Sequence, residues 1–330
     1  MHLKRPLLKL RRRYCAETLA AEVRALPASA WVPHPGSYPG NDAVPLIAKD
    51  GQPSNAFYGT MMPTENLRRC RYIMEIMADI GAVWGRSRLM GLAPGAEVPP
   101  HVDVHYHWRT HIRVHVPVIT NPGVTFTVAG KSVHMSPGEC WVFDSFSLHD
   151  VQNRGSEKRV HLVLDTVGGG RLWDLIEEAQ SAEDDFAEPD VVEPGRGGVD
   201  TLAFEQFNAP GVMSPWEIRC HIGFVAEHAP ADPRLEPVFR RMERFADEWN
   251  AAWARFGLTE PGLPTYQSLL SQAQRDLKML PGAEVKLPNA VPVSRVFKEL
   301  IFDVALAAAP VRSAQPMARA AGLRSGYASG

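Results

Sequence analysis

The sequence predicts an α+β protein with a double-stranded β-helix core, a jelly-roll or cupin-like barrel, and helices before and after it in the chain. Short runs rich in Val, Ile, Thr and Phe recur over residues 83–170, and turns such as NPG and SPG separate them every eight to twelve residues. Eight of the twelve histidines also fall between residues 101 and 161. Many short strands at this spacing are typical of closed two-sheet barrels. The strands are expected over residues 86–92, 98–104, 109–119, 123–129, 131–135, 139–143, 147–152 and 159–166.

The chain before this core is expected to supply N-terminal helices and a substrate loop, over residues 1–82. Residues 16–26 have helical composition, and residues 64–80 place apolar side chains at helical spacing after a Thr-x-x-Asn start. Residues 32–63 between them are rich in Pro, Gly, Asn and Asp. So long a loop in a compact domain tends to bind a ligand or to cover a site.

After the core the composition changes twice more. Residues 171–200 become acidic and then rich in Pro and Gly, which indicates a linker or a surface loop. Residues 201–310 return to helical spacing, and the small, polar residues 311–330 are expected to form a flexible tail. Helices in this region are expected over residues 214–227, 233–256, 264–280 and 293–308.

Composition and charge exclude several classes of protein. The 330 residues carry a net charge of −2, without the basic excess that binds phosphate backbones, so nucleic acid is not an expected partner. No apolar run reaches 18 residues, so no membrane span is expected. The four cysteines form no CxxC pair, and a reducing, cytoplasmic setting is the simplest expectation.

The spacing of three polar residues predicts a metal site. His101 and Asp103 stand two residues apart at the end of an expected strand, so their side chains lie on the same face. His149 follows 46 residues later, at the start of another strand. Two imidazoles and one carboxylate leave three metal positions open, which suits Fe(II) oxygen chemistry better than a closed structural zinc site.

Arg159 stands ten residues after His149, in the apolar strand RVHLVLDT. A cation on a buried strand is costly unless it meets an anion. A guanidinium can bind a carboxylate through two parallel hydrogen bonds, so the distal carboxylate of a keto acid would meet this need.

The segments GAEVPPHVD, RVHVPV, VHMSPGECWVFDSFSLHDVQN and KRVHLVLD resemble the catalytic domain of the aspartyl/asparaginyl β-hydroxylases, which the bacterial free-proline hydroxylases share. The resemblance is close over residues 83–168 and loose over YPGNDAVPL. It implies a double-stranded β-helix, Fe(II), O2 and the co-substrate 2-oxoglutarate. The implied reaction hydroxylates an amino acid or a peptidyl residue of Asp, Asn or Pro type, with release of succinate and CO2.

The resemblance also implies roles for individual residues. His101 and His149 would be iron ligands, Arg159 would anchor the co-substrate, and Arg113 and His115 would line the co-substrate or substrate pocket.

The chain departs from the aspartyl hydroxylase pattern at two positions. Asp103 stands where that subgroup has a glycine, which restores a full facial triad as in the proline hydroxylases and favours hydroxylation over halogenation. Met90 stands where a serine would help to hold the co-substrate, so that contact is not expected here.

Other polar residues leave alternatives open. His161 shares the face of Arg159, as either a co-substrate contact or a core histidine. Arg86 and Arg88 predict an anionic substrate group if their face lines the barrel, and nothing if it meets solvent. Asn41 and Asp42 are candidates for substrate contact, although turn chemistry is the favoured interpretation.

Simpler structural roles are expected for a further set. His105, His107 and His111 are expected mainly at the surface, and Asp144 is expected to shape the turn before His149 through side-chain hydrogen bonds. Packing roles are expected for the tryptophans of the core, Trp84, Trp108 and Trp141.

Two other functions stay open at this stage. One is a cupin-type metal enzyme that needs no keto acid, and the other is a non-catalytic binding module that uses the C-terminal helices. The substrate could be a free amino acid or a peptide. The C-terminal helices could form a homodimer interface, a lid or a peptide-docking surface.

Overall fold

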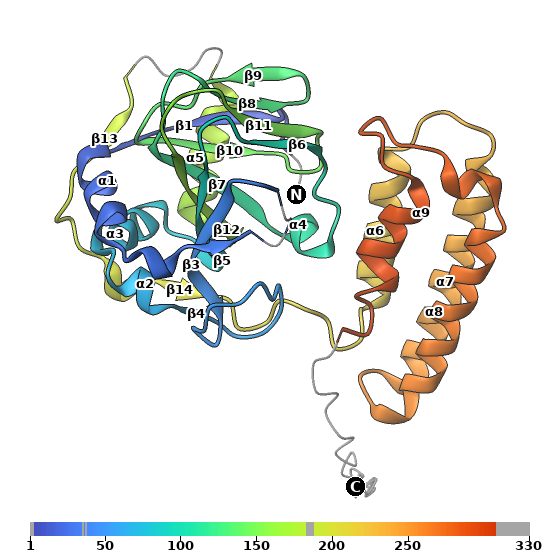
Figure 1. Ribbon diagram of the computed structural model, residues 1–330. Helices are drawn as coiled ribbons and strands as arrows, with labels where there is room; N and C mark the ends of the chain where they lie inside the picture. Colours follow the sequence, from blue (N-terminus) through green and yellow to red (C-terminus); the bar gives the residue numbers. More distant parts are fainter. Residues whose placement is uncertain (1–2, 35, 37, 183–187, 308–330) are drawn as a thin grey trace, which may run out of the picture.

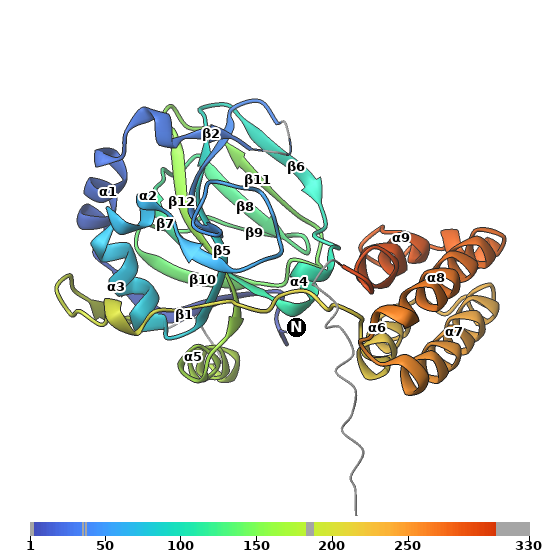
Figure 2. The ribbon, with the colours of Figure 1, turned by 90° about the horizontal axis from the view of Figure 1, so that it is seen from below.

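The computed structural model describes residues 3–34, 36, 38–182 and 188–307. The tail expected over residues 311–330 lies outside them. Figures 1 and 2 show a β-barrel with helices on one flank and a separate group of helices beside it.

The barrel confirms the predicted double-stranded β-helix. Its strands are β5 (Val83–Leu92), β6 (Glu97–His101), β7 (Ile112–Ile119), β8 (Val124–Val128), β9 (Lys131–Val133), β10 (Glu139–Phe143), β11 (His149–Asn153) and β12 (Arg159–Gly168). The larger sheet contains the order β10-β7-β12-β5, and the smaller sheet has the order β6-β11-β8-β9, with antiparallel neighbours throughout. The chain passes back and forth between two facing sheets, as this fold requires.

Each expected strand lies within a few residues of an observed one, apart from the start of β7. Tyr106–Thr110 forms the short helix α4, where residues 109–111 were expected to be strand. The Nδ1 atom of His105 accepts a hydrogen bond from the backbone N–H of His107, which caps this turn and favours helix over strand.

The strands of the larger sheet send alternate side chains to two different environments. In β12, Val160, Leu162 and Leu164 point into the hydrophobic core between sheet and helices, whereas Arg159 and Val163 face the barrel interior. The same alternation in β5 turns Arg86, Arg88 and Met90 inward, and in β7 it turns Arg113 and His115 inward. The period-2 pattern therefore gathers the cations in the barrel.

The helices α1 (Ala16–Ala25), α3 (Arg71–Ile80) and α5 (Gly170–Ser181) cover the outer face of the larger sheet and share its core. The short α2 (Glu65–Arg68) precedes α3, so both N-terminal helical segments lie close to where they were expected. Helix α5 occupies part of residues 171–200, which had been expected to form a linker or loop. It forms because Leu172, Leu175 and Ile176 are spaced to bury one helical face.

Strands also extend the larger sheet from the N-terminal region. β1 (Leu7–Tyr14) pairs with β10, and β3 (Asn41–Lys49) pairs with β5. The interpretation of residues 32–63 as one long loop was wrong over β3. The strand tolerates Pro45 because the register shifts between Pro45 and Ile47, which accommodates a residue that lacks a backbone N–H. Shorter strands complete the sheet at β2 (Val32–Pro33), β4 (Met61–Pro63), β13 (Asp190–Val192) and β14 (Ala203–Phe204).

The C-terminal helices pack around a hydrophobic core of their own. They are α6 (Pro215–Glu227), α7 (Leu235–Phe256), α8 (Leu263–Lys278) and α9 (Val293–Phe297), and α9 continues into a π-helical turn over Lys298–Phe302. In both ribbon views this group lies beside the barrel, next to α4 (Figures 1 and 2). Among the described residues, no helix is long and apolar enough to cross a membrane.

Candidate metal and co-substrate site

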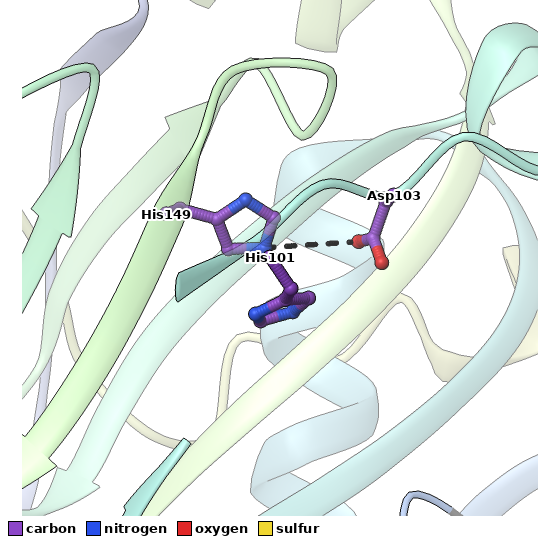
Figure 3. Close-up of side chains that lie close together, drawn as sticks. All are labelled: His101, Asp103 and His149. Carbon is purple, nitrogen blue, oxygen red and sulfur yellow. Dashed lines mark ion pairs between the residues drawn. The ribbon is translucent and has the colours of Figure 1, made fainter. Parts of the chain in front are cut away.

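The three predicted metal ligands lie close together (Figure 3). His101 is the last residue of β6 and His149 the first of β11, and the two are direct partners across this antiparallel pair. Their ring centroids are 4.2 Å apart, and Asp103 Oδ2 lies 3.9 Å from His149 Nε2. One ligand atom from each residue falls within 4.8 Å of the others, so the three side chains could hold one metal ion.

Hydrogen bonds to the backbone fix both imidazole rings. His101 Nδ1 lies 3.0 Å from the Pro99 carbonyl oxygen, and His149 Nδ1 lies 2.9 Å from that of Ser147. A carbonyl only accepts, so each Nδ1 carries the proton and each Nε2 keeps its lone pair for a metal. Burial lowers the pKa of His149 to about 4, which keeps the ring in this neutral, ligating form.

The turn before His149 has the predicted shape. Asp144 Oδ1 accepts a hydrogen bond of 3.1 Å from the Phe146 N–H, and Asp144 Oδ2 accepts one of 3.2 Å from Ser147 Oγ. These contacts confirm that Asp144 shapes the turn leading into β11.

A buried chain of charges orients Asp103. Arg113 donates from Nη1 to Asp103 Oδ2 at 3.1 Å and from Nε to Asp165 Oδ1 at 3.0 Å. Burial acts to raise the pKa of Asp165, but the Arg113 charge and His107 outweigh it and hold the pKa well below its usual value. Arg113 thus links the carboxylate of the metal cluster to a second, permanently ionised carboxylate.

Arg159 is a deeply buried cation that faces the barrel interior. Its side chain is 4% exposed, and no acidic side chain of the described residues pairs with it. Its Nη2 lies 2.7 Å from His161 Nδ1, while its Nε has no hydrogen-bond partner. Burial lowers the pKa of Arg159 to about 9, so the guanidinium remains charged at neutral pH.

The two histidines near Arg159 take different positions. His161 contacts the guanidinium and does not line the cavity, whereas His115 lines it. Neither ring nitrogen of His115 has a hydrogen-bond partner among the described residues. Burial, followed by the charges of Arg113 and Arg159, lowers the pKa of His115 far below its usual value. His115 and Arg159 therefore have buried nitrogen atoms without a protein partner, which a bound ligand could contact.

One cavity of about 410 Å³ brings these groups together. Its wall includes the three metal-ligand candidates together with Arg113, His115 and Arg159. Its apolar lining comes from both sheets, from α4 and from the segment before β4, and consists of Phe57, Met90, Leu92, Val98, Trp108, Phe126, Phe143, Val151 and Val163. This volume suits small organic ligands held by a few charged groups.

Arg86 and Arg88 also line the cavity, with exposures of 3% and 7%. The Arg86 guanidinium lies 4.0 Å from the Phe57 ring centroid and donates to the Asn55 carbonyl oxygen at 3.3 Å. Burial lowers the pKa of Arg86 to about 10 and that of Arg88 to about 9, so both stay charged at neutral pH. Of the two alternatives for this strand face, the structure shows the barrel-lining one.

The structure separates the two candidates at the start of β3. Asn41 lines the cavity, whereas Asp42 forms an ion pair of 2.6 Å with Lys158 and does not line it. Both residues lie in a strand, so they do not form the turn that was favoured for them.

The interpretation of His107 and His111 as surface residues was wrong. Both are buried, with stacked rings 3.7 Å apart, and His111 Nε2 lies 2.7 Å from Glu205 Oε1. His107 Nε2 lies 3.5 Å from Asp165 Oδ2, and burial lowers the pKa of His107 to about 3, so a neutral imidazole stands beside this carboxylate.

Sequence reasoning missed two residues of this chain. Asp165 could have been found, because it stands at even spacing from Arg159 and so shares its face. Glu205 lies in an irregular segment without a comparable signal.

The fold and the cluster define a class of protein: a double-stranded β-helix with two histidines and one carboxylate that line the same cavity as a buried cation. Comparison with known proteins is consistent with this class. Residues 54–168 match the family described as aspartyl/asparaginyl beta-hydroxylase, which confirms the predicted resemblance over this segment.

A curated relative is L-proline cis-4-hydroxylase from Rhizobium meliloti (strain 1021), to which 93 residues are 30% identical. The match covers 28% of this chain and 33% of that protein, so the chain spans about a third of the length of the curated relative.

Solved structures give weaker likenesses. A 2OG-Fe(II) oxygenase family protein from Burkholderia pseudomallei is 14% identical, with a TM-score of 0.33 over 48% of this chain and 93% of its own. A Pseudomonas putida prolyl-4-hydroxylase is also 14% identical, with a TM-score of 0.34 over 49% of this chain and 92% of its own. TM-scores this low support no conclusion about function. The functional conclusion rests on the strand order and on the residues of the cavity.

Proposed function

We propose that the chain is an Fe(II)- and 2-oxoglutarate-dependent dioxygenase that hydroxylates an amino acid or a peptidyl residue of Asp, Asn or Pro type. One observation carries this proposal: a metal-ligand cluster and an unpaired buried arginine face the same cavity. A cytoplasmic setting belongs to the proposal, because all four cysteines are free thiols.

His101, Asp103 and His149 would hold the metal. Two imidazole nitrogens and one carboxylate oxygen suit Fe(II) and leave positions for co-substrate and oxygen. When bound, Fe(II) with 2-oxoglutarate and O2 supplies the oxidising power to hydroxylate an unactivated carbon, with release of succinate and CO2. The protein holds the ligands in register, and Arg113 keeps the Asp103 carboxylate oriented.

Arg159 would hold the distal carboxylate of 2-oxoglutarate. The buried guanidinium has an unsatisfied Nε, and a carboxylate can accept from it through two parallel hydrogen bonds. His161, which does not line the cavity, holds the guanidinium through its contact with Nη2. His115, whose ring nitrogens have no partner, lines the same cavity as Arg159. A bound dicarboxylate would thus remove the cost of a lone buried charge.

Arg86, Arg88 and Asn41 would contact the substrate. Two charged guanidinium groups on one wall favour a substrate with a carboxylate, which a free amino acid or an aspartyl side chain provides. Phe57 backs Arg86 and gives this part of the cavity an apolar surface for the rest of the substrate. Orienting the reacting C–H bond and excluding water are the tasks left to these residues.

Both other functions predict a different site. A cupin-type enzyme without a keto acid would have no use for the unpaired Arg159, and a binding module would have no use for the clustered ligands. The presence of both features in one cavity favours the dioxygenase.

A turnover screen tests the proposal. The protein is incubated with Fe(II), 2-oxoglutarate and O2 against free amino acids and peptides containing Asp, Asn or Pro. We expect one product heavier by one oxygen, in equal amount to the succinate released. The proposal would be contradicted if the folded, iron-loaded protein formed no succinate. It would also be contradicted if succinate formation were the same without iron and in Asp103→Ala.

A further inference from the structure

The C-terminal helices contact the two loops that carry metal-ligand candidates. We call these loops the metal loops: residues 102–110, which contain Asp103, and residues 144–148, which precede His149. They belong to the barrel in sequence, yet their outer surfaces lie against helix α6 and the segment before α9.

The first metal loop is partly built into the core of the helical region. Val104 and Tyr106 are buried and belong to the same hydrophobic cluster as the inner faces of α6 to α9. Tyr106 Oη donates a hydrogen bond of 2.6 Å to Glu217 Oε1 in the first turn of α6. Further along the loop, the Arg109 guanidinium lies 4.3 Å from the ring centroid of Phe224, also on α6.

The second metal loop meets the same helix. The Phe146 ring packs at 4.9 Å from Phe224 and 5.3 Å from His228, measured between centroids. Asn289, from the segment before α9, donates to the Phe146 carbonyl oxygen at 2.8 Å. The second loop is therefore held by a ring contact and by a hydrogen bond to its backbone.

The two metal loops are also bonded to each other. The backbone N–H of Asp103 donates to the Ser145 carbonyl oxygen at 3.0 Å. Phe224 contacts both loops, through Arg109 on one side and Phe146 on the other. A narrow crevice between barrel and helices is lined by Asp103 and Phe146 from the loops and by Phe224 and Leu300 from the helices. A displacement of α6 relative to the barrel would therefore move side chains that contact the loop of Asp103.

We propose that the C-terminal helical region is a positioning element of the metal site, which holds the two metal loops at the separation that metal binding needs. The inference rests on the proposed function, because it assumes that the cluster binds a metal ion. A metal site tolerates only small displacements of its ligands, and short loops need outside contacts to stay within that range. The helices supply those contacts.

The test measures Mn(II) affinity of the full chain, by the loss of the electron paramagnetic resonance signal of free Mn(II). Tyr106→Phe removes only the hydroxyl that bonds Glu217, and Phe224→Ala removes the ring that touches both loops. We expect weakening by about three- to ten-fold, somewhat less than the 10- to 100-fold typical of groups bonded directly to a ligand.

Matched controls make the same changes in the helical core, away from the metal loops. Tyr266→Phe removes a tyrosine hydroxyl that donates to the Gly257 carbonyl oxygen at 2.9 Å, and Phe239→Ala removes a half-buried ring that packs on Phe297. We expect both controls to lower the thermal stability of the helical region and to leave Mn(II) affinity unchanged.

The possible outcomes separate the two proposals. If the wild type binds Mn(II) and Asp103→Ala does not, while Tyr106→Phe and Phe224→Ala bind like the wild type, the positioning role is wrong and the metal site stands. Equal loss in the control variants would also overturn it, because it would reflect general destabilisation. If wild type and Asp103→Ala bind alike, the metal site itself fails. Tyr106→Phe loses a single hydroxyl, so it keeps the test valid should Phe224→Ala not fold.

Discussion

Replacement of Arg159 by methionine should stabilise the protein without co-substrate and weaken co-substrate binding. The reason is that burial of an unpaired charge lowers the free energy of unfolding, and a bound co-substrate anion would offset this loss. Arg159 is buried without an anionic partner among the described residues, and methionine replaces the aliphatic part of its side chain with no charge to desolvate. A residue kept for stability would respond in the opposite direction.

The pKa of Arg159 sets the scale of this effect. Burial lowers it from 12.5 to about 9, which at 1.36 kcal/mol per pKa unit is about 5 kcal/mol against the charged form. This is an upper limit, because the variant also loses the contact with His161. Replacement of buried ions by apolar side chains elsewhere ranges from neutral to about 4 kcal/mol stabilising, so we expect a gain of about 1–4 kcal/mol. Losing two charge-assisted hydrogen bonds, at about 1.5–3 kcal/mol each, should weaken 2-oxoglutarate binding at least 100-fold.

Urea unfolding of the metal-free protein, with Arg113→Met as matched control, measures the first effect. Arg113 bonds Asp103 and Asp165, so its removal leaves the buried Asp165 and the half-buried Asp103 without their cationic partner and should destabilise by about 3–5 kcal/mol. Calorimetry of 2-oxoglutarate with the Mn(II)-loaded protein measures the second. If Arg159→Met destabilised the protein as strongly as Arg113→Met, Arg159 would be structural and the co-substrate reasoning would be refuted.

Three further changes have defined outcomes. Asp165→Asn removes the anion that orients Arg113 and should weaken Mn(II) binding about tenfold, measured by the free Mn(II) signal; unchanged affinity would remove Arg113 from the positioning role. Arg88→Gln should raise the KM for substrate at least tenfold and leave 2-oxoglutarate affinity unchanged, whereas a loss of both would place Arg88 at the co-substrate. Burial and the Arg109 charge lower the pKa of His221 to about 3, so below pH 6.5 the unfolded chain gains a proton that the folded chain excludes, and this histidine alone lowers stability by about 2 kcal/mol from pH 6.5 to pH 5, beside what the other buried histidines contribute. His221→Phe should reduce the fall of the unfolding free energy over this range by that amount, measured by urea unfolding at several pH values, and an unchanged fall would contradict this role of His221.

Local pattern predicted the barrel well, because each strand is bounded by turns rich in Pro or Gly and alternates side chains between two environments. The same rule of two residues per repeat turned Arg86 and Arg88 inward. These features depend on residues close together in the chain, so the sequence alone contained them.

The errors come from contacts between distant parts of the chain. His107 and His111 were predicted at the surface because the partner that buries His111, Glu205, lies 94 residues further along the chain and could not be paired with it from the sequence. The composition of residues 32–63 suggested a loop, although the shift in register against β5 lets Pro45 stand in a strand. The function of the C-terminal helices could not be predicted for the same reason, since Phe224 and Asn289 meet the metal loops only in the folded protein. A homodimer through other faces of these helices remains a prediction.

We propose that one cavity binds Fe(II) through the two histidines and Asp103, and 2-oxoglutarate through Arg159. The most direct test is anaerobic titration of the metal-free protein with Fe(II) and 2-oxoglutarate, followed by the visible metal-to-keto-acid absorption band. We expect the band in the wild type, a much weaker band or none in Asp103→Ala, and a band only at far higher 2-oxoglutarate in Arg159→Ala. A folded, iron-loaded wild type without the band, or variants that match the wild type, would contradict the claim.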